Sequence, residues 1–200
     1  MNPVDTPHAM LQAKLQTKLQ ANPDDVLAQW RARAAEVCVR LGAPGVARPD
    51  QVAGLTGMQV FERIFSGALP RIPIGETLDF IPVEIEFGRA VFQGEPLARH
   101  YNPLGTVHGG WIATLLDSCV GCAVHSTLPA GKGYTTVELK INYVRAVTDK
   151  LALVRAEGKV IHVGGRLATA EGRLTGPDGK LYAHASTTCF VFETPLTERH

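Results

Sequence analysis

The spacing of hydrophobic positions changes along the chain, from a helical period near the start to strand alternation near the end. Residues 22–41 carry apolar side chains at helical spacing and begin with Asn-Pro-Asp-Asp, which supplies an N-cap, a first-turn proline and early acids. Gly42 is expected to end this helix. Residues 10–19 form a weaker amphipathic run, and residues 57–66 predict a short helix. The first third of the chain is therefore expected to be helical.

The last third predicts a β-sheet. Four long runs with strand composition are separated by turn sequences rich in Gly, Pro and Asp; they cover residues 134–144, 150–162, 166–175 and 180–192. An earlier hairpin is expected from about Leu78, with a turn at Gly88-Arg89. The later runs follow one another like a meander, which favours antiparallel pairing.

One strongly apolar helix is predicted over residues 110–127, between the two groups of strands. It is too apolar to be solvated and can be covered only by lying across the sheet. A long helix wrapped by a curved antiparallel sheet is the hotdog architecture, an α+β fold. We therefore expect a helical extension over residues 1–56 and a hotdog domain over residues 57–194.

Composition narrows the function classes. The 200 residues carry a formal net charge of +1, which gives no sign of a surface for nucleic acid. No apolar run approaches the ~20 residues of a membrane span. The first residues lack a basic region followed by an apolar stretch, so we expect no secretory signal and a cytoplasmic location.

Two of the four cysteines, Cys119 and Cys122, form a C-x-x-C pair inside the apolar helix. Such a pair occurs in redox and metal sites. Here no second pair and no suitably spaced histidine accompany it, which favours cysteines that pack as small hydrophobic residues. We expect no metal.

The segment from Asn102 to Asp117 carries the candidate chemistry. Asp117 is a lone carboxylate within the apolar helix, where it costs free energy unless it is paired or used. Gly109 and Gly110 begin that helix and expose N–H groups that can hold a developing anion. An acid and an oxyanion donor suit acyl hydrolysis, although Asp117 could instead cap or pair within the core.

Helix geometry constrains how these groups work together. Gly109 and Asp117 are eight residues apart, or about 12 Å along a straight helix. A base and an oxyanion donor must each come within about 3 Å of their reacting atoms. Either one residue is not catalytic, or the site combines Gly109 of one subunit with Asp117 of another, as in a two-fold dimer with two equivalent sites.

The chain from about residue 75 to 192 resembles the hotdog-fold acyl-CoA thioesterases of the phenylacetate-degradation (PaaI-like) branch. The resemblance rests on an Asn-x5-His-Gly-Gly loop, the Asp eight residues after the first Gly, and the sequence Gly-Tyr-Thr-Thr-Val-Glu-Leu-Lys-Ile-Asn-Tyr that follows. Residues 1–50 have no part in it.

The resemblance implies a role for each matching residue. The Gly109 N–H would polarise the thioester carbonyl, and Asp117 would act as general base or nucleophile. Asn102 would hold the water or the thioester, His108 would position it, and Thr136 would hydrogen-bond near the acid. On the residues alone, His108 could equally bond only to backbone, and Thr136 could be an ordinary strand residue.

Four further residues would contact coenzyme A, namely Gly110, Gly164, Gly165 and Arg166. Arginines on strands are often exposed without a binding role. For Arg166, binding of a CoA phosphate is slightly favoured over that alternative. CoA is then part of the substrate, and no separate cofactor is expected.

The sequence therefore predicts a hydrolase of acyl-CoA with an aryl or medium-chain acyl group, working as a homodimer or homotetramer. The alternative is a non-catalytic acyl-CoA-binding or regulatory hotdog module. A hotdog hydratase would require a His–acid pair, and the helix offers only Asp117. No Gly-x-Ser-x-Gly motif supports a serine hydrolase.

Overall fold

The computed structural model describes residues 22–194. The helices are α2 (Pro23–Arg40), α3 (Pro49–Val52), α4 (Gly57–Phe65), α5 (Pro73–Thr77) and α6 (Gly109–Ser126), with single 3-10 turns at Ala98–His100 and Asp149–Leu151. The strands are β1 (Phe80–Glu86), β2 (Arg89–Gly94), β3 (Lys132–Tyr143), β4 (Val154–Val163), β5 (Leu167–Thr175) and β6 (Leu181–Glu193).

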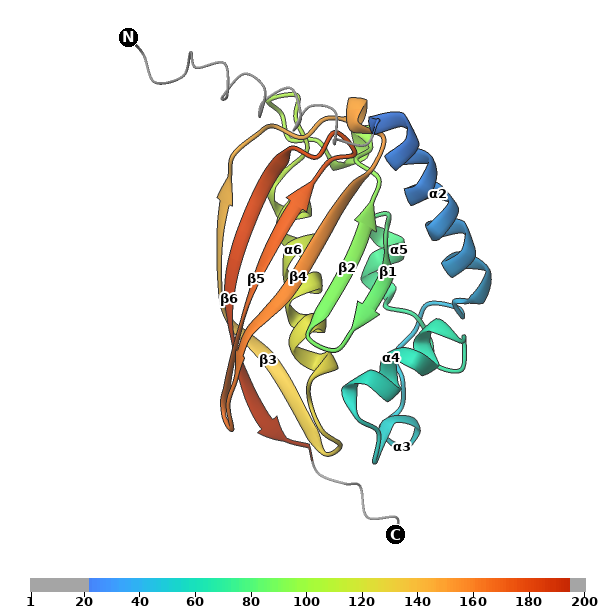
Figure 1. The fold of residues 1–200 in the computed structure, drawn as a ribbon, viewed down its shortest axis with the longest axis vertical. Coiled ribbons are helices and arrows are strands. Elements are labelled where there is room, and N and C mark those ends of the chain that lie inside the picture. The colour runs from blue at the N-terminus through green and yellow to red at the C-terminus, as the bar shows by residue number, and fades with distance from the viewer. Residues whose placement is uncertain (1–21, 195–200) are drawn as a thin grey trace, which may run out of the picture.

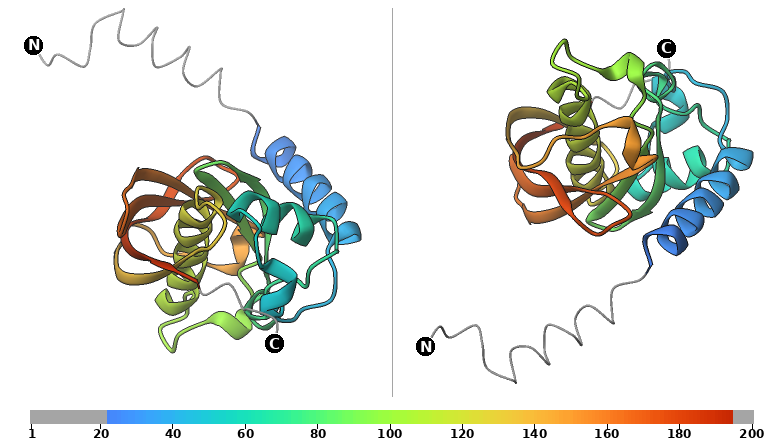
Figure 2. Two further views of the ribbon diagram at one scale, coloured as in Figure 1. Left: turned by 90° about the horizontal axis from the view of Figure 1, so that it is seen from below. Right: turned by 90° about the horizontal axis from the view of Figure 1, so that it is seen from above.

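The six strands form one sheet that curves around α6 (Figures 1 and 2). The strand order is β1-β2-β4-β5-β6-β3, and every neighbouring pair is antiparallel. The predicted first hairpin is confirmed, with Gly88 at φ +77° in the turn, where its lack of a Cβ avoids strain. The hotdog fold, an α+β class, is thus confirmed.

The meander predicted for the last four strands is wrong in one respect. β3 pairs with β6 at the far edge of the sheet, not with β4, which follows it in sequence. The chain from residue 144 to 153 crosses back to the middle of the sheet. Residues 150–153 belong to this crossing as a 3-10 turn and loop, so β4 begins only at Val154. Alternation along one strand does not specify which strand will be its neighbour.

Two glycines in the middle strands let α6 approach the sheet closely. A Cβ on Gly158 of β4 would lie 2.3 Å from the Cys119 carbonyl oxygen, and one on Gly172 of β5 would lie 2.8 Å from a methyl group of Val120. Leu115 and Leu116 of α6 are fully buried, Leu115 against Gly94 of β2 and Leu116 against Gly172 of β5. Each buried aliphatic side chain stabilises the fold by about 1.5–3 kcal/mol, so α6 is the centre of the core.

The predicted helix over residues 22–41 is confirmed as α2, and its Asn22 side chain accepts a hydrogen bond from the Asp24 N–H at 3.2 Å. α2 packs on the hotdog domain. Arg33 donates through Nε to the carbonyl oxygen of Val83 at a bulge in β1 (3.1 Å), and the Arg155 guanidinium lies 4.7 Å from the ring centre of Trp30. The extension therefore covers the β1 side of the sheet.

The helix expected at residues 57–66 is confirmed as α4, while the short helices α3 and α5 were not predicted. The run at residues 10–19 lies outside the described residues. The division of the chain after residue 56 stays a prediction.

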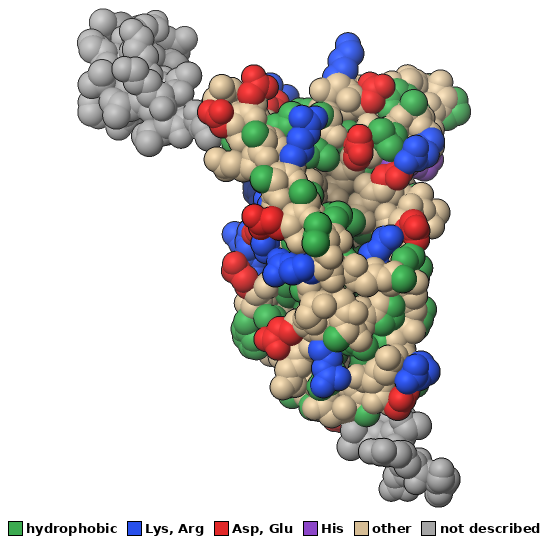
Figure 3. Space-filling view, turned by 90° about the vertical axis from the view of Figure 1, so that its right-hand side faces the viewer, with side chains coloured by type: hydrophobic (Ala, Val, Ile, Leu, Met, Phe, Trp, Pro, Cys, Tyr) green, Lys and Arg blue, Asp and Glu red, His purple; other side chains and the backbone are tan. Residues whose placement is uncertain are grey.

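Lys and Arg side chains alternate with Asp and Glu over the face that carries the N-terminal helices (Figure 3). Within residues 22–194, none of the helices has the length and apolar character needed to cross a membrane.

Candidate active site

Asp117 lies half-buried in the middle of α6 and faces the edge strand β3. The Thr136 hydroxyl donates a hydrogen bond to Asp117 Oδ1 at 3.0 Å. Thr136 lies at a bulge in β3, where the pairing with β6 shifts between residues 136 and 138. The structure thus brings together two of the predicted site residues that are 19 positions apart.

The ionisable groups around Asp117 are held neutral. Burial, followed by the negative charge of Asp117, raises the pKa of the Cys122 thiol to about 12. Burial is also the main cause that raises the pKa of Tyr134 and of Cys189. The thiols of Cys122 and Cys189 and the phenol of Tyr134 are therefore uncharged at neutral pH.

The C-x-x-C pair has no features of a redox or metal centre. Cys119 is buried and its thiol lies 3.2 Å from the Leu116 carbonyl oxygen, and burial raises its pKa well above the ordinary value. In the part of the chain that the structure describes, no three His, Cys, Asp or Glu side chains cluster so as to hold a metal ion.

The start of α6 offers an N–H donor. Among residues 22–194, the N–H of Gly109, the first residue of the helix, donates no hydrogen bond. The Gly109 carbonyl instead accepts a hydrogen bond from the Tyr143 hydroxyl at 3.0 Å. A free N–H at a helix N-terminus, where the helix dipole is positive, can stabilise a developing oxyanion.

The neighbouring predicted residues shape this end of the helix. His108 is the N-cap, and its Nδ1 accepts a hydrogen bond from the Gly110 N–H at 2.8 Å. The Gly110 N–H is thus occupied. The Asn102 side chain accepts from the Leu104 N–H (2.9 Å) and donates to the Thr106 hydroxyl (3.0 Å), which closes the loop that leads into α6.

A cavity of about 320 Å³ lies beside Gly109. Its lining includes Asn102, Gly109, Ile112, Tyr143 and Arg145. Sequence reasoning missed Tyr143 and Arg145. Tyr143 ends the strand in which Thr136 was recognised, but only the fold places it against Gly109.

The predicted CoA-contacting residues Gly164, Gly165 and Arg166 form the turn between β4 and β5. Arg166 is exposed, and its guanidinium lies 5.7 Å from the ring centre of Phe190. Thr136 pairs with Cys189, which in turn pairs with Ala168. The turn therefore lies near the level of Asp117 along the sheet, two strands away from β3.

The structure keeps the two halves of the candidate site apart within one chain. Gly109 and Asp117 belong to one continuous helix, which separates them by about 12 Å along its axis. We call Asp117 with Thr136 the acid half, and Asn102, His108, Gly109 and Tyr143 the oxyanion half.

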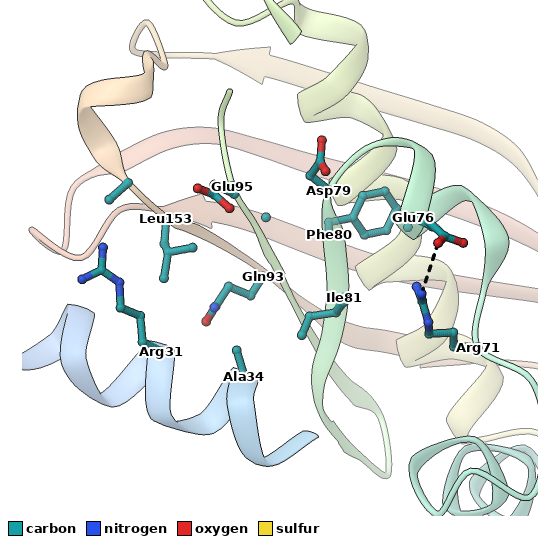
Figure 4. Close-up of a pocket in the computed structure, with 13 residues that line it drawn as sticks. Arg31, Ala34, Arg71, Glu76, Asp79, Phe80, Ile81, Gln93, Glu95 and Leu153 are labelled. Atoms are coloured by element: carbon teal, nitrogen blue, oxygen red, sulfur yellow. Dashed lines mark ion pairs between the residues drawn. The ribbon is translucent and has the colours of Figure 1, made fainter. Parts of the chain in front are cut away.

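Two larger cavities lie elsewhere. One of about 480 Å³ lies between α2, α5, β1 and β2, and Figure 4 shows charged side chains around it, including the Arg71–Glu76 ion pair. Another of about 530 Å³ lies between α3, α4 and the start of β3. Neither cavity is lined by Asp117 or Gly109.

Comparison with known proteins places the chain in a family. Residues 104–183 match the model of the thioesterase superfamily, a segment that contains Gly109, Asp117 and Thr136. The chain is 35% identical over 85 residues to a Halobacterium salinarum protein named as an esterase; the match covers 42% of this chain and 54% of that relative, about half of its length.

Two further proteins agree with this assignment. The chain is 25% identical over 116 residues to a 1,4-dihydroxy-2-naphthoyl-CoA hydrolase of Listeria monocytogenes, which covers 58% of this chain and 93% of that protein. A solved structure of the phenylacetic acid degradation protein PaaI from Thermus thermophilus superposes with a TM-score of 0.53 at 28% identity, covering 59% of this chain and 97% of the other. The fold, the helix with its Gly109 and Asp117, and these matches together show that the chain belongs to the thioesterase superfamily, with PaaI-like proteins among its structural neighbours.

Proposed function

We propose that this protein hydrolyses acyl-CoA thioesters to a carboxylic acid and free CoA. The observation that carries the proposal is the pair of unlike groups along α6: a carboxylate bonded only to Thr136, and a helix N-terminus whose first N–H has no acceptor among residues 22–194. The Listeria relative, named as a hydrolase of an aromatic acyl-CoA, supports the substrate class. Aryl and medium-chain acyl groups are the candidates.

The chemistry requires few groups because a thioester is already activated. As general base, Asp117 takes a proton from water while the water oxygen bonds to the thioester carbonyl carbon. The carbonyl oxygen gains negative charge, which the Gly109 N–H stabilises. The carbon–sulfur bond then breaks, and the sulfur leaves as CoA after taking the proton. As nucleophile, the Asp117 carboxylate would instead attack the carbonyl carbon, and the carbon–sulfur bond would break to release CoA, whose sulfur takes a proton from solvent. Water would then hydrolyse the resulting anhydride to the acid and the free Asp117 carboxylate.

The two halves meet if two chains share each site. In residues 22–194 β3 pairs with β6 alone, so its other edge is open for pairing. Thr136 contacts Asp117, and Tyr143 contacts Gly109. In an antiparallel pair of β3 strands with a two-fold axis at Lys140, Tyr143 of one chain would lie opposite the bulge that carries Thr136 of the other.

Such a dimer would therefore bring Gly109 of the partner subunit toward Asp117, and it would form two equivalent sites. Val137 and Tyr143 lie on this edge, and in the single chain about half of the surface of each is exposed (58% and 51%). This exposure supports coverage of the edge by a second copy of the chain. We propose a homodimer as the minimal unit, and a homotetramer remains compatible with it.

We propose that a further group of residues contacts the CoA part of the substrate. Gly110, Gly164, Gly165 and Arg166 are the candidates, with the exposed Arg166 guanidinium as a clamp for phosphate. We propose no resident cofactor and no nucleic-acid or membrane partner, and a cytoplasmic location stays a prediction.

A thiol-release assay over a panel of acyl-CoAs tests the proposal. Wild type is expected to release CoA from at least one aryl or medium-chain substrate. Asp117→Asn, which keeps the shape and the hydrogen bond from Thr136, is expected to lower kcat by about 10²–10⁴-fold, the usual contribution of a general base. The matched control is Asp25→Asn, an exposed acid in the first turn of α2.

Release of CoA from no member of the panel above the Asp117→Asn background would overturn the proposal. Saturable binding of acyl-CoA without release, measured by calorimetry, would instead establish the non-catalytic acyl-CoA-binding module.

A further inference from the structure

A polar cluster lies behind the oxyanion half and is not used by the proposed chemistry. It consists of Asp79, Arg99 and His100, of which only His100 is buried while the Arg99 side chain is exposed, and it contacts Trp111 in the first turn of α6. The Arg99 guanidinium binds both carboxylate oxygens of Asp79. That pairing lowers the pKa of Asp79, which therefore remains an anion.

The His100 ring is fixed on three sides. The side chain is 4% exposed, and its Nδ1 accepts a hydrogen bond from the Leu97 N–H at 3.2 Å, which leaves the proton on Nε2. Nε2 lies 2.8 Å from Asp79 Oδ2, off the line of a well-aligned hydrogen bond. The ring stacks on the indole of Trp111, with centres 5.1 Å apart and planes 20° apart.

Trp111 is held in turn, because its indole N–H donates to the Leu78 carbonyl oxygen at 2.7 Å. Asp79 follows Leu78 with φ +54°, a conformation that is unfavourable for a residue with a Cβ. A strained residue persists where its surroundings fix it, and such residues are concentrated at functional sites.

The main chain of His100 connects this cluster to the oxyanion half. Its carbonyl oxygen accepts a hydrogen bond from the His108 N–H at 2.7 Å, and Tyr101 and Val107 form the next bridge of the loop. His100 and His108 are thus the base of the loop that carries Asn102 and ends at Gly109. A displacement of the His100 ring would move both the loop base and the first turn of α6.

We propose that His100, held by Asp79, is a positioning residue that sets the direction of the Gly109 N–H toward the thioester carbonyl. It acts through the His108 N–H and through Trp111, and it touches neither Asp117 nor the cavity beside Gly109. This inference rests on the proposed thioester hydrolysis.

If the side chain at position 100 only filled space, a phenyl ring would cost less free energy to bury than the imidazole of His100. An imidazole placed beside a carboxylate must be desolvated, which disfavours it relative to a phenyl ring of similar size. His100→Phe therefore keeps the stack on Trp111 and removes both ring nitrogens. Asp79→Asn removes the charge, and Asn tolerates a positive φ better than most residues.

The test combines kinetics with the vibrational spectrum of the bound substrate. Both variants are expected to lower kcat about tenfold to a hundredfold, as misplacement of about 1 Å does in active sites, with KM changed less than threefold. In an Asp117→Asn background, which slows turnover, the carbonyl stretch of a bound acyl-CoA is expected to move back toward its solution frequency when His100→Phe is added. His184→Phe, on β6 away from the loop, is the matched control and is expected to change neither readout.

An unchanged kcat in both variants overturns the inference, and so does a loss of kcat without a change in the carbonyl frequency. If His100→Phe does not fold, the kcat and the carbonyl frequency of Asp79→Asn are compared with those of wild type instead. A wild-type protein that hydrolyses no acyl-CoA overturns the proposed function and this inference together, whereas an active wild type with unaffected variants overturns the inference alone.

Discussion

The two halves of the candidate site differ in how completely one chain builds them. The oxyanion half is closely hydrogen-bonded: the Asn102 side chain closes its loop, His108 caps the helix, and Tyr143 holds the Gly109 carbonyl. Within residues 22–194 the Asp117 carboxylate accepts one hydrogen bond, from the Thr136 hydroxyl, and it lies near an open sheet edge.

This difference indicates which half depends on its surroundings. Hydrogen bonds within one chain pre-organise the oxyanion half, so its donor direction is set before any partner arrives. The acid half faces an edge strand, and in the proposed dimer the second copy would exclude water from it and supply the oxyanion donor. This difference supports a site that combines groups from two chains. Three experiments test that proposal.

The largest effect is expected from removing the oxyanion donor. Gly109→Pro deletes the N–H at the first position of α6, where proline is favoured, and His108 already has the extended ψ of 135° that precedes a proline. We expect kcat to fall about 10²–10³-fold with α6 intact. Steady-state CoA release and circular dichroism measure the two quantities.

Crowding of Tyr143 needs a separate control, because a Cβ on Gly109 would lie 3.2 Å from its ring. Gly109→Ala adds the same Cβ and keeps the N–H. Equal losses in the two variants would contradict the role of the donor.

Mixed dimers test whether the halves come from different chains. A chain with Asp117→Asn and a chain with Gly109→Pro are each expected to be inactive alone. Random co-refolding makes half of the dimers mixed, and each mixed dimer contains one intact site of two. Activity should therefore recover to about a quarter of wild type.

The readout is CoA release after co-refolding, compared with each variant refolded separately. Mixtures no more active than their parents would show that each site lies within one chain, and would leave the 12 Å separation along α6 without an explanation.

The smallest of the three effects is expected at the acid half itself. Thr136→Val keeps the shape and a strand-favouring side chain but removes the hydrogen bond to Asp117. Because Asp117 is half-buried and water can replace the lost donor, we expect kcat to fall about tenfold and the free energy of unfolding to change by about 1 kcal/mol or less. Thr136→Ser, which keeps the hydroxyl, is the matched control, and equal kcat for Val and Ser would exclude a role for this bond.

Local patterns predicted most of the elements. The apolar period and the N-cap at Asn22 predicted α2, and the glycine turn at Gly88 predicted the first hairpin. The short helices α3 and α5 were missed because four or five residues carry too little periodicity to be recognised. The segment from Asn102 to Asp117 was recognised whole, because its residues are close in sequence.

The cluster behind the oxyanion half could not be predicted, because Asp79, His100 and Trp111 are brought together only by the packing of β1 against the start of α6. His100 has no distinctive sequence spacing. The place of β3 at the sheet edge was missed for the same reason, since strand pairing depends on long-range packing.

The sequence by itself determined the helix that carries Gly109 and Asp117, and with it the distance that separates them, because residue spacing in a helix fixes both. Only the tertiary structure decided which strand faces Asp117, that Tyr143 lies against Gly109, and that the free edge of β3 joins the two contacts. Those relations depend on contacts between residues far apart in the chain, which no local period encodes.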